Sequence, residues 1–289
     1  MNIRDLISQK SPSLSLEFFP PKEKADQEDF FARVEKMKKV NPSFVSITCG
    51  AGGSSPDSTL ETASRLQNGL GLETMAHLTC LGSKRKELES SLSQLQESNI
   101  NNVLALRGDP PKDATGFSVD NGDFLYAADL VRFVRERFPE MGIGVAGYPE
   151  AHPDSPTVGS DLNYVKEKLD CGADFLITQF LFDNRIYFDF VERLKAMGVD
   201  KPIIPGVLPV LSLRSVRHIL NISGASIPGR FYLELEEAHE KGGAAEVRKL
   251  GVEFAQNQIR DLLKGGAPGI HLYTMNQPGP TLQIAEAMK

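Results

Sequence analysis

Cysteine is scarce in this chain. Its three cysteines, Cys49, Cys80 and Cys171, form no C-x-x-C pair. An odd number without close spacing does not make an even set of disulfides. We therefore expect a protein of a reducing compartment, the cytoplasm.

The chain also lacks long apolar runs and an excess of positive charge. No run approaches the roughly 18–20 residues that a membrane helix needs, and the first residues show no signal-peptide pattern. The formal net charge is -6, which disfavours nucleic acid as a partner because phosphate binding needs a basic face. A small anionic cofactor needs only a few local positive groups and stays compatible with this charge.

Short apolar, β-rich segments alternate with longer amphipathic segments throughout the chain. The predicted strands cover residues 14–19, 44–48, 74–78, 103–106, 143–146, 175–178, 203–206 and 270–274. The predicted helices cover residues 28–40, 58–68, 83–97, 126–138, 161–170, 186–197, 213–220 and 281–287. Eight strand–helix repeats of about 30 residues are typical of a (β/α)8 TIM barrel. An open doubly wound sheet shows the same alternation, and the count of eight favours the barrel.

One segment, residues 219–265, interrupts this rhythm with Pro228, an acidic stretch and an extra helix near 244–264. We predict a helical insertion before the last strand, in a single domain of residues 1–289. Local signals mark three helix boundaries. Ser83 is a candidate N-cap, Pro139 ends the preceding helix, and Gly172 fits a left-handed C-terminal cap.

Polar residues stand at or just beyond the C-terminal ends of seven predicted strands, where barrel enzymes build their active sites. They are Glu17, Thr48, His77, Arg107 with Asp109, Tyr148 with His152, Gln179, and Tyr273. Each has a structural alternative. Glu17 could be a surface carboxylate, although its apolar neighbours favour burial. His77 could be a core histidine, and Arg107 with Asp109 an ion pair across a turn.

Two glycine-rich segments resemble phosphate-binding loops. Residues 142–147 match G-x-G-x-x-G, but they lie along a predicted strand with no helix opening from them, so we interpret the match as accidental. Residues 50–55 do lie between a strand and a helix, and their backbone amides could face an anion. That signal is weak.

At these strand ends the chain resembles the methylenetetrahydrofolate reductase family, in its bacterial form with the catalytic domain alone. The matching segments are LEFFPPK, FVSITCGAGG, AHLTCLG, ALRGDPP, GYPEAHP, GADFLITQFLFD, IIPGVLPV and HLYTMNQ, in the family's order from Ser13 to Gln277. The resemblance implies the same eight-stranded barrel.

The resemblance further implies FAD, NADH or NADPH as reductant, 5,10-methylenetetrahydrofolate as substrate and 5-methyltetrahydrofolate as product. Glu17 resembles the family's general acid, and we expect an apolar site to raise its pKa for that role. Asp109 resembles the aspartate that stabilises a cationic iminium. Gln179 resembles the glutamine that contacts the folate and the nicotinamide in turn, and Thr48 resembles a nicotinamide contact.

The positions that resemble FAD contacts are Cys49, Ala51, His77, Arg107, Gly108, Asp109, Ala127, Tyr148, His152, Asp161 and Lys168. We assign no metal ligand, and a homo-oligomer is expected. The sequence departs from the family's usual residues at Ser215, Gln277, Tyr164 and Glu167. The departures at Gln277 and Ser215 bear on folate binding, and those at Tyr164 and Glu167 on FAD.

Other functions fit parts of this pattern. Glu17, His77, Asp109 and His152 are residue types that suit a metal-dependent lyase or hydrolase, although none are closely spaced. A non-catalytic protein that binds folate or flavin is a second alternative. A Schiff-base aldolase fits less well because no predicted strand carries a lysine at its rim end.

Overall fold

A computed structural model describes residues 1–49, 56–110 and 122–289. Eight parallel strands close into a barrel in the order β1 to β8, with β8 paired to β1. This closure confirms the predicted barrel and excludes the open doubly wound sheet. The strands are β1 Ser13–Phe18, β2 Phe44–Ile47, β3 Thr74–Thr79, β4 Asn102–Leu106, β5 Gly142–Gly147, β6 Phe175–Phe180, β7 Ile203–Val207 and β8 Gly269–Tyr273.

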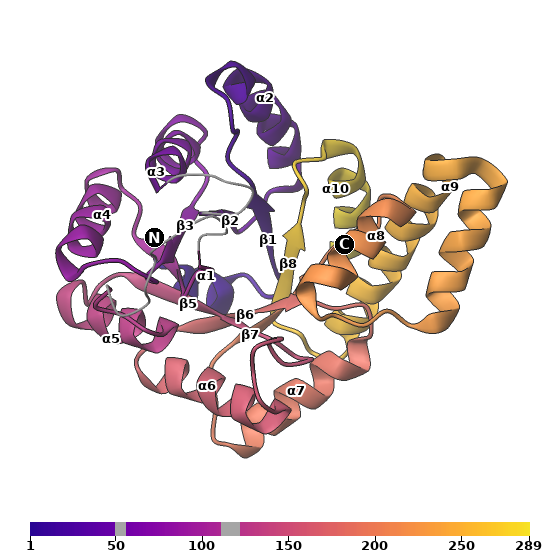
Figure 1. Cartoon of the computed structure of the whole chain (residues 1–289). Helices are drawn as coiled ribbons and strands as arrows, with labels where there is room; N and C mark the ends of the chain where they lie inside the picture. The colour runs from indigo at the N-terminus through magenta and orange to yellow at the C-terminus, as the bar shows by residue number, and fades with distance from the viewer. Residues whose placement is uncertain (50–55, 111–121) are drawn as a thin grey trace.

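Helices surround the strands on the outside (Figure 1). They are α2 Gln27–Met37, α3 Pro56–Ser64, α4 Arg85–Glu97, α5 Ala127–Arg137, α6 Val158–Asp170, α7 Asn184–Ala196, α8 Leu213–Ser223, α9 Gly229–Lys264 and α10 Pro278–Ala285. A π-helical turn, Arg65–Gly69, extends α3, and 3-10 turns cover Lys24–Asp26, Lys38–Val40 and Glu286–Met288. Each strand and helix predicted from the sequence is present.

Five helices, α3, α4, α6, α7 and α10, begin two or three residues away from their predicted starts. α4 begins at Arg85 rather than at Ser83, because the carboxylate of Asp123 accepts a hydrogen bond from the Arg85 backbone amide at 2.9 Å. α6 begins at Val158, three residues before its predicted start, because Thr157 caps it and accepts from the Ser160 amide. The boundary at Pro139 is confirmed, and Gly172 has the positive φ, 114°, expected of its place after α6.

The insertion is larger than the single helix predicted near 244–264. α9 starts at Gly229 and is broken at Gly242 and Gly243, whose backbone angles are not helical. Its two arms fold back on each other, since the ring of Phe231 stacks on Phe254 with centroids 3.7 Å apart. This hairpin packs beside α8 (Figure 1).

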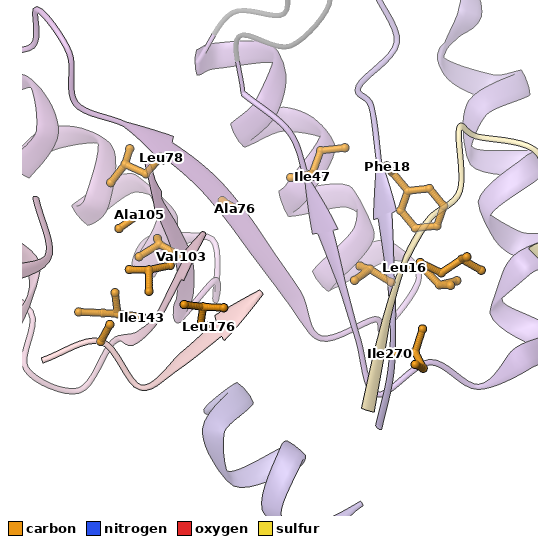
Figure 2. Packing of buried hydrophobic residues seen from close by; sticks show 14 of the residues in the cluster. Leu16, Phe18, Ile47, Ala76, Leu78, Val103, Ala105, Ile143, Leu176 and Ile270 are labelled. Atoms are coloured by element: carbon orange, nitrogen blue, oxygen red, sulfur yellow. The ribbon is translucent and has the colours of Figure 1, made fainter. Parts of the chain in front are cut away.

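The barrel has two apolar cores, because parallel strands in this fold are buried on both faces. The outer core lies between strands and helices and includes Leu16, Phe18 and Ile47 (Figure 2). The inner core fills the barrel with Phe44, Met75, Leu104, Phe175, Ile177 and Ile204.

A short N-terminal helix, α1 Ile3–Gln9, also contributes to the inner core. Ile3 and Ile7, one helical turn apart, pack with the inner core, and Asn102 accepts a hydrogen bond from the Ile3 amide at 2.9 Å. The sequence analysis missed this helix, because seven residues are too few to show a periodic pattern. With apolar residues filling this part of the interior, the polar residues gather near the C-terminal ends of the strands. Among the described residues, no helix combines the length and apolar character needed to cross a membrane.

Candidate active site

The centre of the site is the carboxyl group of Glu17, held between two imidazoles inside the barrel. His271 Nε2 lies 3.2 Å and His77 Nε2 lies 3.4 Å from the same oxygen, Oε2 of Glu17. The three side chains come from β1, β8 and β3 and are all buried. The structure thus brings together Glu17 and His77, as the sequence predicted, and adds His271.

The electrostatics of this cluster correct one expectation. Burial alone would raise the pKa of Glu17, but the hydrogen bond with His271 and the charges of His77 and His271 outweigh it, so the pKa lies below its ordinary value. Burial also lowers the pKa of His77 to about 4, although Glu17 acts in the opposite direction. In the ligand-free protein the carboxylate form of Glu17 is therefore favoured, and the predicted rise of its pKa is wrong for this state.

The other ring nitrogen of His271 also has a hydrogen-bond partner. Its Nδ1 lies 2.8 Å from the hydroxyl of Ser15, and that hydroxyl lies 3.2 Å from the carbonyl oxygen of Ile270. When Nδ1 is unprotonated, the Ser15 hydroxyl can donate to it. When Nδ1 carries a proton, it can donate to Ser15, which then donates to Ile270. The sequence analysis missed His271 because only the strand register places it opposite Ser15.

Tyr273 connects this cluster to the rest of the rim. Its hydroxyl donates to the carbonyl of Thr178 at 3.1 Å, and burial with the nearby charge of Glu17 raises its pKa well above the ordinary value. The ring fits because Gly206 lies beside it. A Cβ at residue 206 would approach the Tyr273 ring to 2.7 Å and the Thr178 carbonyl to 2.5 Å.

The end of β2 places two predicted cofactor contacts, Thr48 and Cys49. The side chain of Thr48 is buried, and its hydroxyl has no hydrogen-bond partner among the described residues. Its backbone carbonyl accepts from the hydroxyl of Thr59 at 3.0 Å. Cys49 is half-buried, and burial raises the pKa of its thiol. Ala51 and the glycine-rich segment 50–55 lie outside the described residues.

The loop after β5 gathers three further predicted residues. The rings of Tyr148 and His152 meet edge to face with centroids 4.7 Å apart. Asp161 at the start of α6 accepts from the His152 amide at 3.2 Å and from the Ser155 hydroxyl at 2.7 Å. Because His152 Nδ1 accepts from the Asp154 amide at 3.1 Å, the proton of the neutral ring is on Nε2.

Lys168 lies one turn from the end of α6 and turns inward. Its ammonium donates to the carbonyl of Ala146 on β5 at 2.6 Å. Burial lowers the pKa of Lys168 to about 8, while Asp161 acts in the opposite direction. An anion bound here would favour the protonated amine.

The loop after β4 is more open. Asp109 is exposed, yet it is near enough to Tyr148 that its charge adds to burial in raising the pKa of that tyrosine to about 12. Gly108 has φ 83°, and a Cβ there would meet Thr79 at 3.0 Å. Arg107 donates to the carbonyl of Leu125 at 3.2 Å, and in the part of the chain that the structure describes it makes no ion pair with Asp109.

Two predicted positions have simpler surroundings. Ala127 is the first residue of α5 and is half-buried. Gln179 is half-buried near the end of β6, and its side-chain oxygen accepts from the Phe180 amide at 3.1 Å.

Three of the four departures from the family pattern have local partners, whereas Tyr164 is exposed on α6. Ser215 belongs to the N-terminal cap of α8, where its hydroxyl donates to the Ser212 carbonyl at 2.7 Å. The carboxylate of Glu167 accepts from Arg132 of α5 at 2.6 Å. Gln277 is the N-cap residue of α10, and its carbonyl accepts from the Thr281 hydroxyl at 2.7 Å.

Unpaired polar atoms in the site fit a cofactor better than a metal. Thr48 Oγ1, His77 Nε2 and Asp161 Oδ2 are buried without a hydrogen-bond partner among the described residues. Buried polar atoms of this kind are costly unless a ligand or water pairs with them. Within residues 1–49, 56–110 and 122–289, no cluster of three or more His, Cys, Asp or Glu is arranged to hold a metal ion. Of the four candidate ligands of the metal-dependent alternative, Glu17 and His77 lie together, but Asp109 and His152 do not join them in such a cluster.

A closed barrel with a buried carboxylate and two imidazoles near the C-terminal ends of its strands has the layout of a barrel enzyme. The family model described as methylenetetrahydrofolate reductase matches residues 2–289. The chain belongs to this family.

Similar proteins named as reductases support the assignment. The chain is 34% identical to 5,10-methylenetetrahydrofolate reductase of Salmonella typhimurium, over 96% of this chain and 90% of the relative. It is 38% identical to methylenetetrahydrofolate reductase (NADH) 1 of Arabidopsis thaliana, over 95% of this chain and 48% of the relative. The chain therefore spans about half the length of the curated plant relatives it matches.

Solved structures share the fold. An uncharacterized protein from Clostridium thermocellum that binds two copies of 5-methyl-5,6,7,8-tetrahydrofolic acid superposes with a TM-score of 0.66 at 14% identity, covering 99% of this chain and 98% of that one. A 2,3-dimethylmalate lyase superposes with a TM-score of 0.55 at 11% identity, covering 99% of this chain and 84% of that one. At these identities the likeness concerns the fold alone.

Proposed function

We propose that residues 1–289 form one catalytic unit that reduces 5,10-methylenetetrahydrofolate to 5-methyltetrahydrofolate, with FAD as cofactor and NADH or NADPH as reductant. The observation that carries this proposal is the family match over residues 2–289. The buried carboxyl of Glu17 between two imidazoles supports it, because ring opening of the folate needs a proton donor in a water-poor site. Assembly into a homo-oligomer and location in the cytoplasm stay predictions from the sequence.

The residues of the rim divide into two groups in this proposal. Those around the β5 loop and α6, namely Tyr148, His152, Asp161 and Lys168, hold FAD together with Cys49, Ala51, His77, Arg107, Gly108, Asp109 and Ala127. The Lys168 ammonium suits a phosphate, and the unpaired carboxylate oxygen of Asp161 suits a hydroxyl donor. When bound, the flavin carries hydride between the nicotinamide and the folate. Thr48 offers its unpaired hydroxyl to the nicotinamide.

The second group acts on the folate. Glu17 donates a proton to the ring nitrogen as its bond to the methylene carbon breaks, which leaves an iminium cation on the other nitrogen. The carboxylate of Asp109 stabilises this cation, and Gln179 positions the pterin through its side-chain amide. Hydride addition to the iminium carbon then gives the methyl group. Because the ligand-free site favours the Glu17 carboxylate, the pKa of Glu17 must rise once the substrate is in place.

The proposal is tested by an absorbance spectrum of the purified protein and anaerobic titration with each reduced nicotinamide. A flavin spectrum that bleaches with NADH or NADPH and returns on addition of 5,10-methylenetetrahydrofolate is the expected result. A colourless protein that binds no FAD would overturn the proposal. A protein that binds flavin and folate without turnover would instead support the non-catalytic alternative, to which the departures at Ser215 and Gln277 are relevant.

A further inference from the structure

The loop that carries Tyr148 and His152 contains a strained residue. Ala151 has φ 68°, in the left-handed region that is unfavourable for a residue with a Cβ. Such a conformation persists only where its surroundings fix it. Within the loop, the Ala151 amide donates to the Tyr148 carbonyl at 3.0 Å, and this turn brings His152 back toward the Tyr148 ring.

The loop is fixed from outside on both sides of Ala151. After it, the His152 amide donates to Asp161 of α6 at 3.2 Å. Before it, the carboxylate of Glu150 accepts from the Ser226 backbone amide at 2.9 Å and also from the Ser226 hydroxyl. Ser226 is separated from Glu150 by 76 residues of chain and lies in the connection between α8 and α9.

A second contact joins the same two segments. Gly224 ends α8 with φ 68°, and a Cβ at this position would lie 3.2 Å from Cγ of Pro153. The connection from Gly224 to Pro228 therefore rests on the β5 loop at Pro153 as well as at Glu150. The hairpin of α9, which packs on α8, keeps this connection in place.

We propose that Glu150 is a positioning residue that, through Ser226, lets the α8–α9 insertion hold the β5 loop in the shape that presents Tyr148 and His152 to the flavin. This inference rests on the proposed flavin site. It gives a role both to the carboxylate of the GYPEAHP segment and to the insertion.

FAD affinity of the apoprotein tests the proposal. E150A and S226A are each expected to raise the Kd for FAD by about three- to tenfold, the usual effect of losing one hydrogen bond. The double variant is expected to have the same Kd for FAD as the more affected single variant, because both changes remove the same contact. E150Q keeps an acceptor oxygen and is expected to regain most of the affinity. The visible circular dichroism of the bound flavin is expected to change in E150A and to recover in E150Q.

The matched control is E234A, which removes a half-buried carboxylate of the insertion that pairs with Arg230 at 3.0 Å. Its Kd for FAD is expected to equal that of the wild type. Unchanged affinity in E150A and S226A, additive losses in the double variant, or an equal loss in E234A would each overturn the proposal.

Hydrogen–deuterium exchange of the ligand-free protein separates this inference from the proposed function. In S226A the amides of residues 148–157 are expected to exchange faster, while those of α4 stay unchanged. If the wild type binds no FAD, the proposed function fails, and the exchange data alone still decide whether Ser226 holds the loop. Unchanged exchange in that segment would overturn the contact's role.

Discussion

The imidazole of His271 lies 3.2 Å from the carboxylate of Glu17, and both groups are buried inside the barrel. A carboxylate with such a donor is stabilised in its charged form. The ligand-free site therefore favours the charged form of Glu17, which is held by His271 and, behind it, by Ser15.

Glu17→Gln tests the acid role. The variant keeps the size of the side chain and an oxygen that can accept from His271, so we expect the fold and flavin reduction by nicotinamide to persist. Reduction of the folate is expected to fall by about 10²–10⁴-fold, the usual worth of a general acid. Anaerobic stopped-flow measurement of the two half-reactions checks this, and an equal loss in both would contradict the acid role.

His77→Gln tests the electrostatics through stability. The folded pKa of His77, about 4, lies below its ordinary value of 6.5, so the stability linked to it is complete above 6.5 and is lost as pH falls toward 4. In that window the free energy of unfolding falls by up to about 1.4 kcal/mol for each pH unit. Glu17, whose pKa is also lowered, adds its own loss only below 4.5. The free energy of unfolding, measured with urea at several pH values between 6.5 and 5, is expected to change less with pH in His77→Gln than in the wild type.

The exposed His218 supplies the control for this experiment. In His218→Gln the free energy of unfolding is expected to change with pH as it does in the wild type. If the free energy of unfolding of His77→Gln also changed with pH as in the wild type, His77 would be protonated as easily in the folded protein as in the unfolded chain.

Thr48→Val tests whether the unpaired hydroxyl serves a ligand. Because this buried hydroxyl has no partner among the described residues, its replacement by a methyl group is expected to leave the free energy of unfolding unchanged or higher. The KM for the nicotinamide is expected to rise by about three- to tenfold. Thr274→Val is the matched contrast, since the Thr274 hydroxyl donates to the Glu17 carbonyl at 2.6 Å and its loss is expected to cost about 1–3 kcal/mol. A Thr48→Val variant as unstable as Thr274→Val would assign Thr48 a structural role.

Lys168→Ala tests the phosphate-binding role. The Kd for FAD is expected to rise by at least tenfold, with little change in folate affinity. In the wild type, FAD affinity is expected to fall as pH rises through about 8, where the ligand-free amine loses its proton. Equilibrium titration of the apoprotein checks both effects, and the pH dependence is expected to vanish in the variant.

Lys166→Ala removes a neighbouring lysine of α6 that pairs with Asp170 at 2.6 Å. Its FAD affinity is expected to match the wild type. Equal losses in the two lysine variants would indicate a general effect of charge on α6 rather than a contact by Lys168.

Much of this architecture follows from short-range features of the sequence. The strands from Ser13–Phe18 to Gly269–Tyr273 are apolar and flanked by turns, so their number and their ends were predictable to within two residues. The carboxyl ends of parallel strands meet at one rim, and this fixes where Glu17, His77 and Tyr148 must lie. Two helical segments were not predicted. Helix α1 is too short to show a periodic pattern, and the first arm of α9 shows only a weak one.

What the sequence determined by itself is the order of strands and helices, the rim that carries the polar residues, and the family. Only the tertiary structure decided that the barrel closes, that His271 faces Glu17 across the β1–β8 pair, and that Ser226 reaches Glu150. The pKa of Glu17 also depends on these contacts, since burial and hydrogen bonding shift it in opposite directions. The physical reason is that periodicity and capping act over a few residues, whereas register, closure and electrostatics join groups that are far apart in the chain.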